Sequence, residues 1–147
     1  MKIALVCSHG GHLTEMNYLL EAFQEHEIFF VTYESVRTRK LSHRKYLIDA
    51  IGTSPVKMGI GFFKILKIFL KERPDIVVST GSEIAIPAFY IAKIFRAKTI
   101  FIECWCRVKT SSATGRIIYW IADIFLVQWP DLQEIYGIKA QFQGAII

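Results

Sequence analysis

The chain has 147 residues, of which 52% are hydrophobic, so it can bury one substantial core and is predicted to form a single domain over residues 1–147. Its formal net charge of +5 favours an anionic partner, such as a nucleotide or lipid phosphate or an anionic membrane surface. No zinc-finger or RRM signature accompanies this charge, and no uninterrupted apolar run reaches about 18 residues. We therefore expect neither a nucleic-acid partner nor a transmembrane helix.

The chain contains three cysteines, Cys7, Cys104 and Cys106. An odd number at this spacing supports no disulfide framework and indicates a reducing compartment. Cys104 and Cys106 have no matching second pair elsewhere, so we expect no metal site and assign both to packing. The N-terminus leads directly into a strand pattern and lacks the layout of a signal peptide.

The first informative stretch follows the apolar run Ile3–Val6, which predicts a strand. It consists of Ser8, His9, Gly10, Gly11 and His12. The apolar spacing beyond it predicts a helix, and the free N–H groups at a helix start suit a phosphate or diphosphate. Adjacent glycines let the backbone approach such a ligand closely. The alternative is a turn that binds nothing, because the loop lacks the third glycine of a dinucleotide fingerprint and the lysine of a Walker A loop.

The next elements are two strands separated by a basic segment. Residues 28–32 predict a buried parallel strand, and residues 46–51 predict a short third strand. The intervening residues 34–44 are polar and basic. This segment fits either a solvated loop or short helix, or a loop that faces a phosphate. Residues 52–55 predict a turn.

Residues 61–71 have the spacing of an amphipathic helix, whose apolar face contains Phe62, Ile65, Leu66, Phe69 and Leu70. Another face carries lysines beside an aromatic residue, namely Phe63, Lys64, Lys67 and Lys71. One interpretation is an ordinary helix that packs on a sheet. The other is a basic amphipathic helix that lies on an anionic membrane surface. Both hold if one face meets the sheet and the other meets lipid.

The second half of the chain continues the alternation of strands and helices. Strands are predicted at residues 76–79, 99–103, 124–128 and 140–143, and helices at residues 84–95 and 114–122. This order predicts an α/β, Rossmann-like fold with a mostly parallel sheet and helices on both faces. Because the carboxyl ends of parallel strands meet at one edge, three loops should converge there: Ser8–His12, Thr80–Glu83 and Glu103–Ser112.

Three motifs, in a fixed order, then resemble one family. They are Ser8-His9-Gly10-Gly11-His12 with Glu15-Met16, Glu103-Cys104-Trp105-Cys106-Arg107-Val108-Lys109 with Ser111, and Val127-Gln128-Trp129. Over residues 2–147 the chain resembles the acceptor-side subunit of the bipartite UDP-N-acetylglucosaminyltransferase that adds the second sugar in asparagine-linked glycan assembly. It also resembles the bacterial relatives of that subunit in capsule and exopolysaccharide synthesis.

The resemblance implies the N-terminal half of a GT-B glycosyltransferase, similar to the peptidoglycan lipid-linked N-acetylglucosaminyltransferase. It implies that a separate donor-binding subunit supplies the C-terminal half, which binds most of the UDP-sugar. The present chain, as the N-terminal half, is then expected to bind a polyprenyl-diphosphate-linked acceptor and to bring the complex to the cytoplasmic face of the membrane. No cofactor and no metal are implied.

The same resemblance suggests roles for residues of the three loops. His12 or His9 would take the proton of the acceptor hydroxyl, and Glu103 is the competing candidate base. Arg107 and Lys109 would hold phosphate oxygens. The other substrate-binding candidates are Ser8, Gly10, Gly11, Gly81, Ser82 and Ser111. A simple ion pair between Glu103 and Arg107 is the structural alternative at the third loop.

The chain also departs from the family pattern. Eukaryotic members carry an N-terminal membrane anchor that this sequence lacks, so peripheral association is expected. Thr80–Glu83 replaces the family's usual proline-containing loop, so no role is carried over to Glu83. Two other function classes stay open, namely a non-catalytic scaffold that recruits and activates a partner glycosyltransferase, and a stand-alone nucleotide-binding or reductase domain.

The last segment, Tyr136–Ile147, is apolar for a chain end. Unanchored chain ends are normally polar and frayed, so this segment is expected to be covered. One interpretation is that it docks on the partner subunit. The other is that it forms an edge strand of its own sheet.

Overall fold

The computed structural model describes residues 1–147 and is built on one seven-stranded sheet in which all neighbouring strands are parallel. The spatial order of the strands is β3-β2-β1-β4-β5-β6-β7. Their bounds are β1 Lys2–Cys7, β2 Glu27–Tyr33, β3 Lys45–Ile48, β4 Ile76–Ser79, β5 Lys98–Ile102, β6 Ile124–Val127 and β7 Ala140–Phe142. The predicted Rossmann-like, parallel α/β fold is confirmed.

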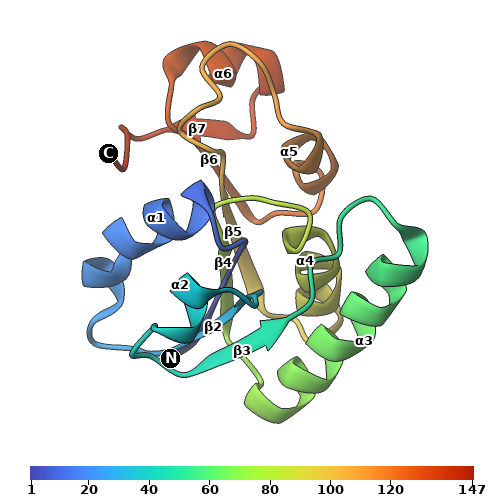
Figure 1. Ribbon diagram of the computed structural model, residues 1–147. Helices are drawn as coiled ribbons and strands as arrows, with labels where there is room; N and C mark the ends of the chain where they lie inside the picture. Colours follow the sequence, from blue (N-terminus) through green and yellow to red (C-terminus); the bar gives the residue numbers. More distant parts are fainter.

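Helices cover both faces of this sheet (Figure 1). One face is covered by α1 (Gly11–Tyr18), the short 3-10 helix η1 (Leu20–Phe23) and α2 (Val36–Arg39). The other face is covered by α3 (Pro55–Glu72), α4 (Ala85–Ile94), α5 (Ala113–Ile118) and α6 (Pro130–Tyr136). None of these helices combines the length and the apolarity that a membrane crossing requires.

Strand β1 shows how the sequence divides between the two faces. Ala4 and Val6 belong to a core cluster of 26 buried residues on the side of α3–α6, and Ile3 and Leu5 belong to a cluster of 8 on the side of α1. Successive side chains of a strand point to opposite faces, so a strand covered on both sides needs an unbroken apolar run. This requirement explains why the strands were visible in the sequence.

Aromatic side chains fill the larger core. The ring of Phe101 stacks on Phe125 with centroids 5.1 Å apart and meets Phe89 edge-on at 6.1 Å. All three side chains are fully buried. Burying one such side chain contributes about 1.5–3 kcal/mol, so these contacts bind α4 firmly to β5 and β6.

Helix α3 begins six residues before its predicted start. Ser54 caps its first turn by accepting a hydrogen bond from the Lys57 N–H at 3.4 Å, and Pro55 occupies the first helical position. A serine cap followed by proline is a helix-start signal, and the turn assigned to residues 52–55 concealed it. Leu70, predicted on the buried face, is 50% exposed.

Two predicted elements end three or more residues early, and one helix was not predicted. Strand β3 ends at Ile48 instead of residue 51, and α5 ends at Ile118 instead of residue 122. Helix α6 was missed, because Pro130 and Asp131 were assigned to a turn although proline also suits a first helical turn. Burial of Leu132 in the main core fixes this helix against β6 and β7.

A buried carboxylate ties the amino-terminal end of the sheet to α3. Glu72 is 4% exposed and accepts hydrogen bonds from Tyr46, from Lys2 Nζ at 3.1 Å and from Arg44 at 3.1 Å. Burial disfavours its charge, but these donors outweigh burial and hold the pKa of Glu72 below 4.5. The basic segment between β2 and β3 is therefore partly structural.

The strand order positions the functional edge. Strand β1 lies between β2 and β4, so the chain leaves β1 toward one side of the sheet and leaves β4 toward the other. Parallel sheets bind ligands at such a switch point, beyond the carboxyl ends of the strands. The loops after β1, β4 and β5 lie there side by side, as predicted.

Two glycines of α3 provide a test of its packing. A Cβ atom at Gly61 would lie 2.5 Å from Cδ1 of the buried Ile51, whereas a Cβ at Gly59 would meet nothing within 4 Å. Both alanine substitutions gain similar helix propensity. We expect Gly61→Ala to be less stable than Gly59→Ala by about 1–3 kcal/mol, because only the former overpacks the contact with Ile51. Urea denaturation of the two variants measures this difference, and equal stability would contradict the packing described.

Candidate functional site

A cavity of about 230 Å³ opens at the carboxyl edge of the sheet, where the three predicted loops meet. Its lining comes from the loops after β1, β4 and β5 and from the start of α5. The lining residues are His12, Gly81, Ser82, Glu103, Cys104, Cys106, Arg107, Ser112, Ala113 and Thr114.

Two reciprocal hydrogen bonds hold the first loop against the second. Nδ1 of His12 lies 2.8 Å from the carbonyl oxygen of Thr80, and the Thr80 hydroxyl donates to the carbonyl of His12 at 2.7 Å. A carbonyl only accepts, so Nδ1 of His12 must carry the proton. The remaining nitrogen, Nε2, then has a free lone pair and can accept a proton or bind a metal.

The backbone of the second loop fits closely around this histidine. Gly81 has a φ of 122°, and a Cβ atom there would lie 2.8 Å from Cε1 of His12. The position therefore requires glycine both for its conformation and for its contact. Ser82 also has a positive φ of 77°, which is uncommon for a residue other than glycine and costs about 1–3 kcal/mol. Such local strain is typical of functional loops.

Glu83 anchors this strained loop from outside the cavity. Its carboxylate accepts hydrogen bonds from the hydroxyls of Tyr33 at 2.8 Å and Ser82 at 2.7 Å, and from the N–H of Gly52 at 3.3 Å. Burial opposes its charge, but the hydrogen bonds prevail and hold its pKa below 4.5. Glu83 thus links the loop after β4 to the ends of β2 and β3.

Glu103, the competing candidate base, is fully engaged in hydrogen bonds. It is 1% exposed, and its carboxylate accepts from Tyr136, from the N–H and hydroxyl of Ser112 at 3.1 and 2.9 Å, and from the N–H of Cys104 at 2.9 Å. Burial and the bond to Glu103 both raise the pKa of the Tyr136 hydroxyl, which keeps it a donor. Glu103 forms no ion pair with Arg107, so the simple pairing considered from sequence is wrong.

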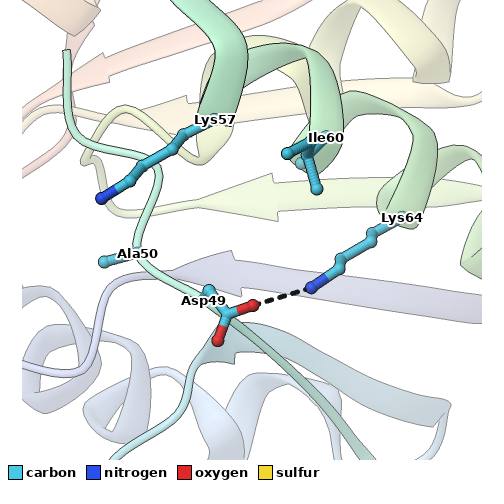
Figure 2. Close-up of a pocket in the computed structure, with 6 residues that line it drawn as sticks. Asp49, Ala50, Lys57, Ile60 and Lys64 are labelled. Atoms are coloured by element: carbon cyan, nitrogen blue, oxygen red, sulfur yellow. Dashed lines mark hydrogen bonds and ion pairs between the residues drawn. The ribbon is translucent and has the colours of Figure 1, made fainter. Parts of the chain in front are cut away.

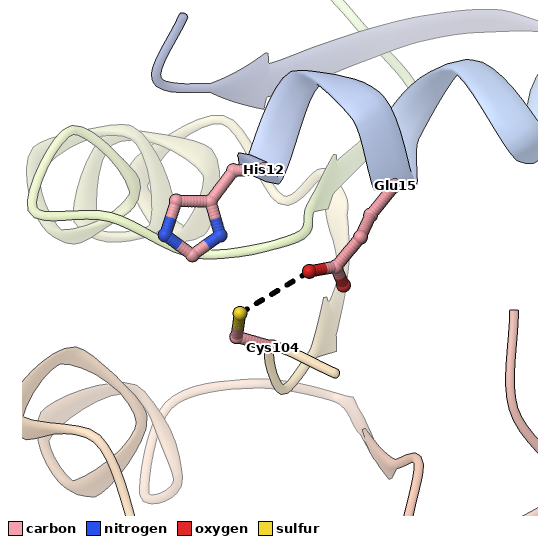
Figure 3. Close-up of side chains that lie close together, drawn as sticks. All are labelled: His12, Glu15 and Cys104. Carbon is pink, nitrogen blue, oxygen red and sulfur yellow. Dashed lines mark hydrogen bonds between the residues drawn. The ribbon is translucent and has the colours of Figure 1, made fainter. Parts of the chain in front are cut away.

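A second buried carboxylate, Glu15, belongs to the first motif, but the sequence alone indicated no role for it. Glu15 is 4% exposed and accepts from Gln128 Nε2 at 2.8 Å, from the N–H of Trp105 at 3.3 Å and from Cys104 Sγ at 3.1 Å. Figure 3 shows Glu15 and His12 projecting from α1 toward Cys104. Glu15 follows His12 by three positions, so helical geometry places both on one face.

The two cysteines of the third loop do not pack in the core as expected. Cys104 is half-buried, Cys106 is exposed, and their sulfur atoms lie 3.0 Å apart. Burial raises the pKa of the Cys104 thiol, so it stays protonated and donates to Glu15. Ligand atoms of His12, Glu15 and Cys104 all lie within 4.8 Å of one another, which makes this corner of the cavity the place where a metal could bind.

The cavity brings together only part of the predicted site. Five predicted residues line it, namely His12, Gly81, Ser82, Glu103 and Arg107. Six others lie outside it, namely Ser8, His9, Gly10, Gly11, Lys109 and Ser111. The ring of His9 is exposed and faces Tyr33, with centroids 6.2 Å apart. The two histidines that bracket the glycines therefore point to different surroundings.

The two glycines of the first loop are next to open space. A Cβ atom at either Gly10 or Gly11 would meet nothing within 4 Å, and no side chain caps the first turn of α1. The free N–H groups of this turn can therefore bind an anion. Arg37 of α2 donates to the Gly10 carbonyl at 3.3 Å and to the Thr14 hydroxyl at 2.9 Å. This arginine fixes the loop and places a positive charge beside it, and its segment forms the short helix α2 that was one alternative from sequence.

The predicted membrane residues lie on α3, away from the cavity. Phe63 is 64% exposed, and with Val56, Ile60 and Leu70 it forms an apolar stripe along the outer side of the helix. Lys64 bonds to Asp49 at 2.8 Å, and Lys71 lies over the ring of Tyr46. A separate hollow of about 400 Å³ lies here. Figure 2 shows Lys57 and Lys64 on either side of Ile60, above Asp49.

The C-terminal segment is partly a strand of the chain's own sheet. Residues Ala140–Phe142 form β7, which pairs with β6 at the edge. Beyond it, the N–H of Ile146 donates to Gln128 Oε1 at 2.9 Å, and its side chain packs against the core cluster on the α1 side. The edge-strand interpretation is confirmed for residues Ala140–Phe142. The last residue, Ile147, is 55% exposed.

With this geometry in view, comparison with known proteins assigns a family. The family described as oligosaccharide biosynthesis protein Alg14 like matches residues 34–146, which is more than half of the chain. The chain belongs to the Alg14 family. The family resemblance read from the three motifs is therefore confirmed.

Similar proteins extend this assignment of the Alg14-family chain. The human protein named UDP-N-acetylglucosamine transferase subunit ALG14 is 32% identical over an alignment of 185 residues, gaps included. The alignment covers all of this chain and 83% of the human protein. The Saccharomyces cerevisiae protein of the same name is 24% identical over 183 residues, which cover all of this chain and 77% of the yeast protein.

A solved structure supports the predicted correspondence with half of a GT-B glycosyltransferase. MurG from Acinetobacter baumannii superposes with a TM-score of 0.81 at 15% identity, over 99% of this chain and 45% of the MurG chain. At this identity the likeness shows the fold alone. The Alg14-family chain thus has the fold of somewhat less than half of MurG.

Glu83 provides a pH-dependent test of the loop architecture. At neutral pH we expect Glu83→Gln to lower the free energy of unfolding by about 1–3 kcal/mol, because an amide cannot accept all three hydrogen bonds. The folded-state pKa of Glu83 is lowered below its ordinary value of 4.5. The stability that the Glu83 carboxylate contributes is therefore present above pH 4.5 and is lost as the pH falls through the folded-state pKa. The difference between wild type and variant should therefore shrink in acid.

Urea denaturation at neutral and acidic pH measures this difference. The matched control is Glu25→Gln, because Glu25 is exposed and forms no ion pair. A loss of stability that is equal for the two variants, or that persists unchanged in acid, would contradict the anchoring role of Glu83.

Proposed function

We propose that this chain is the acceptor-binding, membrane-recruiting subunit of a two-subunit glycosyltransferase. The reaction transfers a sugar from a UDP-sugar, namely UDP-N-acetylglucosamine, to a polyprenyl-diphosphate-linked sugar at the cytoplasmic face of the membrane. The observation that carries this proposal is His12, which lines the same cavity as Arg107 and whose Nδ1 is bound to Thr80, so that Nε2 is free. The names of the relatives support the donor and the subunit role.

His12 is the proposed general base. The hydroxyl of the acceptor sugar attacks the anomeric carbon of the donor sugar, the bond from that carbon to the UDP oxygen breaks, and the hydroxyl proton passes to Nε2 of His12. The Thr80 carbonyl fixes the tautomer and ring orientation that this transfer needs. His12 and Thr80 lie in the loops that follow the neighbouring strands β1 and β4, so the sheet fixes the position of the base.

The acceptor diphosphate is proposed to bind between the first loop and Arg107. The uncapped first turn of α1 offers N–H groups, and the open space beside Gly10 and Gly11 permits close approach of phosphate oxygens. Arg107 forms no ion pair and can offer two parallel donors to a phosphate. Arg37 adds positive charge at the other side of the loop. Lys109 and Ser8 lie outside the cavity and are proposed to contact the periphery of the same diphosphate.

Glu103 is better suited to positioning than to proton transfer. Its carboxylate already accepts hydrogen bonds from Tyr136, Ser112 and Cys104, and the side chain is 1% exposed. A base must be within hydrogen-bond reach of the proton that it takes. We therefore assign Glu103 to holding the start of α5 against the third loop, and we retain His12 as the base in preference to His9.

The donor-binding partner is proposed to cover the apolar surface at the C-terminal ends of α5 and α6. Trp120 is 80% exposed and Ile138 is fully exposed, and a hollow of about 540 Å³ lies between them with Ser111 at its rim. Large exposed apolar patches mark interaction sites. This surface also fits the alternative of a non-catalytic scaffold, because docking alone would explain it.

The apolar stripe of α3 is the proposed membrane contact. Val56, Ile60, Phe63 and Leu70 recur at helical spacing on the exposed side, with Lys67 within the stripe. Lysines along one edge of such a stripe attract anionic headgroups, while the apolar side chains insert among the acyl chains. The opposite face of α3 packs on the sheet, so both interpretations of this helix can hold.

The role of His12 is tested in the assembled two-subunit enzyme. We expect His12→Asn to lower turnover of the lipid-linked acceptor by roughly a hundredfold, since asparagine can keep a donor for Thr80 but offers no base. The matched control is His9→Ala, which should retain turnover within severalfold because His9 faces Tyr33 instead of the cavity. Initial rates with UDP-N-acetylglucosamine measure both variants, and co-purification checks assembly. Normal turnover of an assembled His12→Asn enzyme would favour the scaffold alternative.

Membrane binding is tested by flotation with vesicles that contain phosphatidylglycerol. We expect the double variant Phe63→Glu, Lys67→Glu to bind about tenfold or more weakly, because it removes an inserted aromatic side chain and reverses a charge at the surface. The control is Trp120→Glu, which alters an exposed aromatic residue on α5's side of the molecule. Equal losses in the two proteins, or no loss in either, would show that α3 is not the membrane contact.

A further inference from the structure

We propose that His12, Glu15, Cys104 and Cys106 form a binding site for a thiophilic divalent cation, with Zn²⁺ as the best-suited ion. Figure 3 shows the first three side chains converging from α1 and from the loop after β5. Their candidate ligand atoms lie within 4.8 Å of one another. The fourth ligand, Cys106, brings its sulfur to 3.0 Å from that of Cys104.

The distances fit a site that is nearly formed. A tetrahedral zinc ion with bonds of about 2.0–2.3 Å keeps its ligand atoms roughly 3.3–3.8 Å apart. Cys104 Sγ lies 3.1 Å from Glu15 Oε1 and 3.0 Å from Cys106 Sγ. Ligand atoms of His12, Glu15 and Cys104 already lie within 4.8 Å of one another, so side-chain rotations bring them to the distances that the ion requires.

The surroundings of these ligands match those of metal sites. A histidine that binds metal usually donates its other ring N–H to a carbonyl or carboxylate, and His12 donates Nδ1–H to Thr80. A carboxylate ligand is likewise fixed by hydrogen bonds, and Glu15 is held by Gln128 at 2.8 Å. These contacts fix the His12 ring and the Glu15 carboxylate beside Cys104 before any ion binds, and Nε2 is the ring nitrogen left free for a metal.

The donor set selects the class of metal. Two thiolates, one imidazole and one carboxylate suit Zn²⁺ and disfavour Mg²⁺ and Ca²⁺, which bind through oxygen. Binding displaces the thiol protons of Cys104 and Cys106 into solvent and leaves the neutral imidazole of His12 as a ligand. The Cys-x-Cys pair alone did not indicate a metal site. The structure adds a His-x-x-Glu pair from α1.

This site and the proposed proton transfer use the same lone pair. Zinc on Nε2 of His12 would prevent it from accepting a proton, so the metal-loaded chain is a form in which His12 is not a base. That consequence rests on the proposed function, whereas metal binding itself does not. A binding experiment on the chain alone therefore separates the failure of one from the failure of the other.

The experiment titrates the purified full-length chain with Zn²⁺ against a chromophoric chelator, in the presence of a phosphine reductant. We expect one zinc per chain, and a thiolate-to-metal charge-transfer band when Co²⁺ replaces Zn²⁺. The variants Cys104→Ser and His12→Ala should each lower the zinc affinity by about a hundredfold, and Glu15→Gln by about tenfold or more. Circular dichroism checks that each variant is folded.

The control is His9→Ala, which removes the other histidine of the same loop and should bind zinc as wild type does. The proposal is overturned if wild type and Cys104→Ser bind zinc equally. It is also overturned if His12→Ala and Glu15→Gln both bind as wild type, because the two thiols alone would then be capturing the ion. Co²⁺ binding without the charge-transfer band would equally exclude the sulfur ligands.

Discussion

The hydrogen bonds between His12 and Thr80 join the two loops on which the candidate site depends. One runs from the imidazole to the Thr80 carbonyl, and the other runs from the Thr80 hydroxyl to the His12 carbonyl. They connect the strands on either side of the switch point, β1 and β4, and they determine which ring nitrogen is free. Gly81 is required next to them because any larger residue would collide with the imidazole. Chemistry at this edge therefore depends on a backbone contact as much as on side chains.

The sheet and the converging loops were predictable from local patterns. The apolar runs at residues 3–6 and 76–79 had to be strands covered on both faces, and parallel strands must bring their following loops to one edge. The start of α3 was harder, because Gly59 and Gly61 weaken the helical pattern while Ser54 and Pro55 suit a turn as well as a cap. The structure resolves this choice by packing Gly61 against Ile51.

The contacts that shape the cavity could not be predicted in this way. Glu15 and Gln128 are 113 positions apart in the chain, and their hydrogen bond exists only because β1 and β6 belong to the same sheet. Glu103 was visible as a carboxylate after a strand, but its partner Tyr136 lies on a helix that the sequence pattern did not indicate. Such distant partners decide whether a carboxylate is free to act as a base or has a structural role.

The hydrogen bonds to these buried carboxylates also affect the electrostatics of the site. Three acidic side chains at this edge, Glu15, Glu83 and Glu103, accept hydrogen bonds from hydroxyl, amide or thiol groups within the chain. Arg107 has no acidic partner, and Arg37 contacts only a carbonyl and a hydroxyl. Carboxylates that are satisfied internally compete weakly for these arginines, so the positive charge at this edge stays available to an incoming anion. The edge can thus carry several buried acids and still suit a diphosphate.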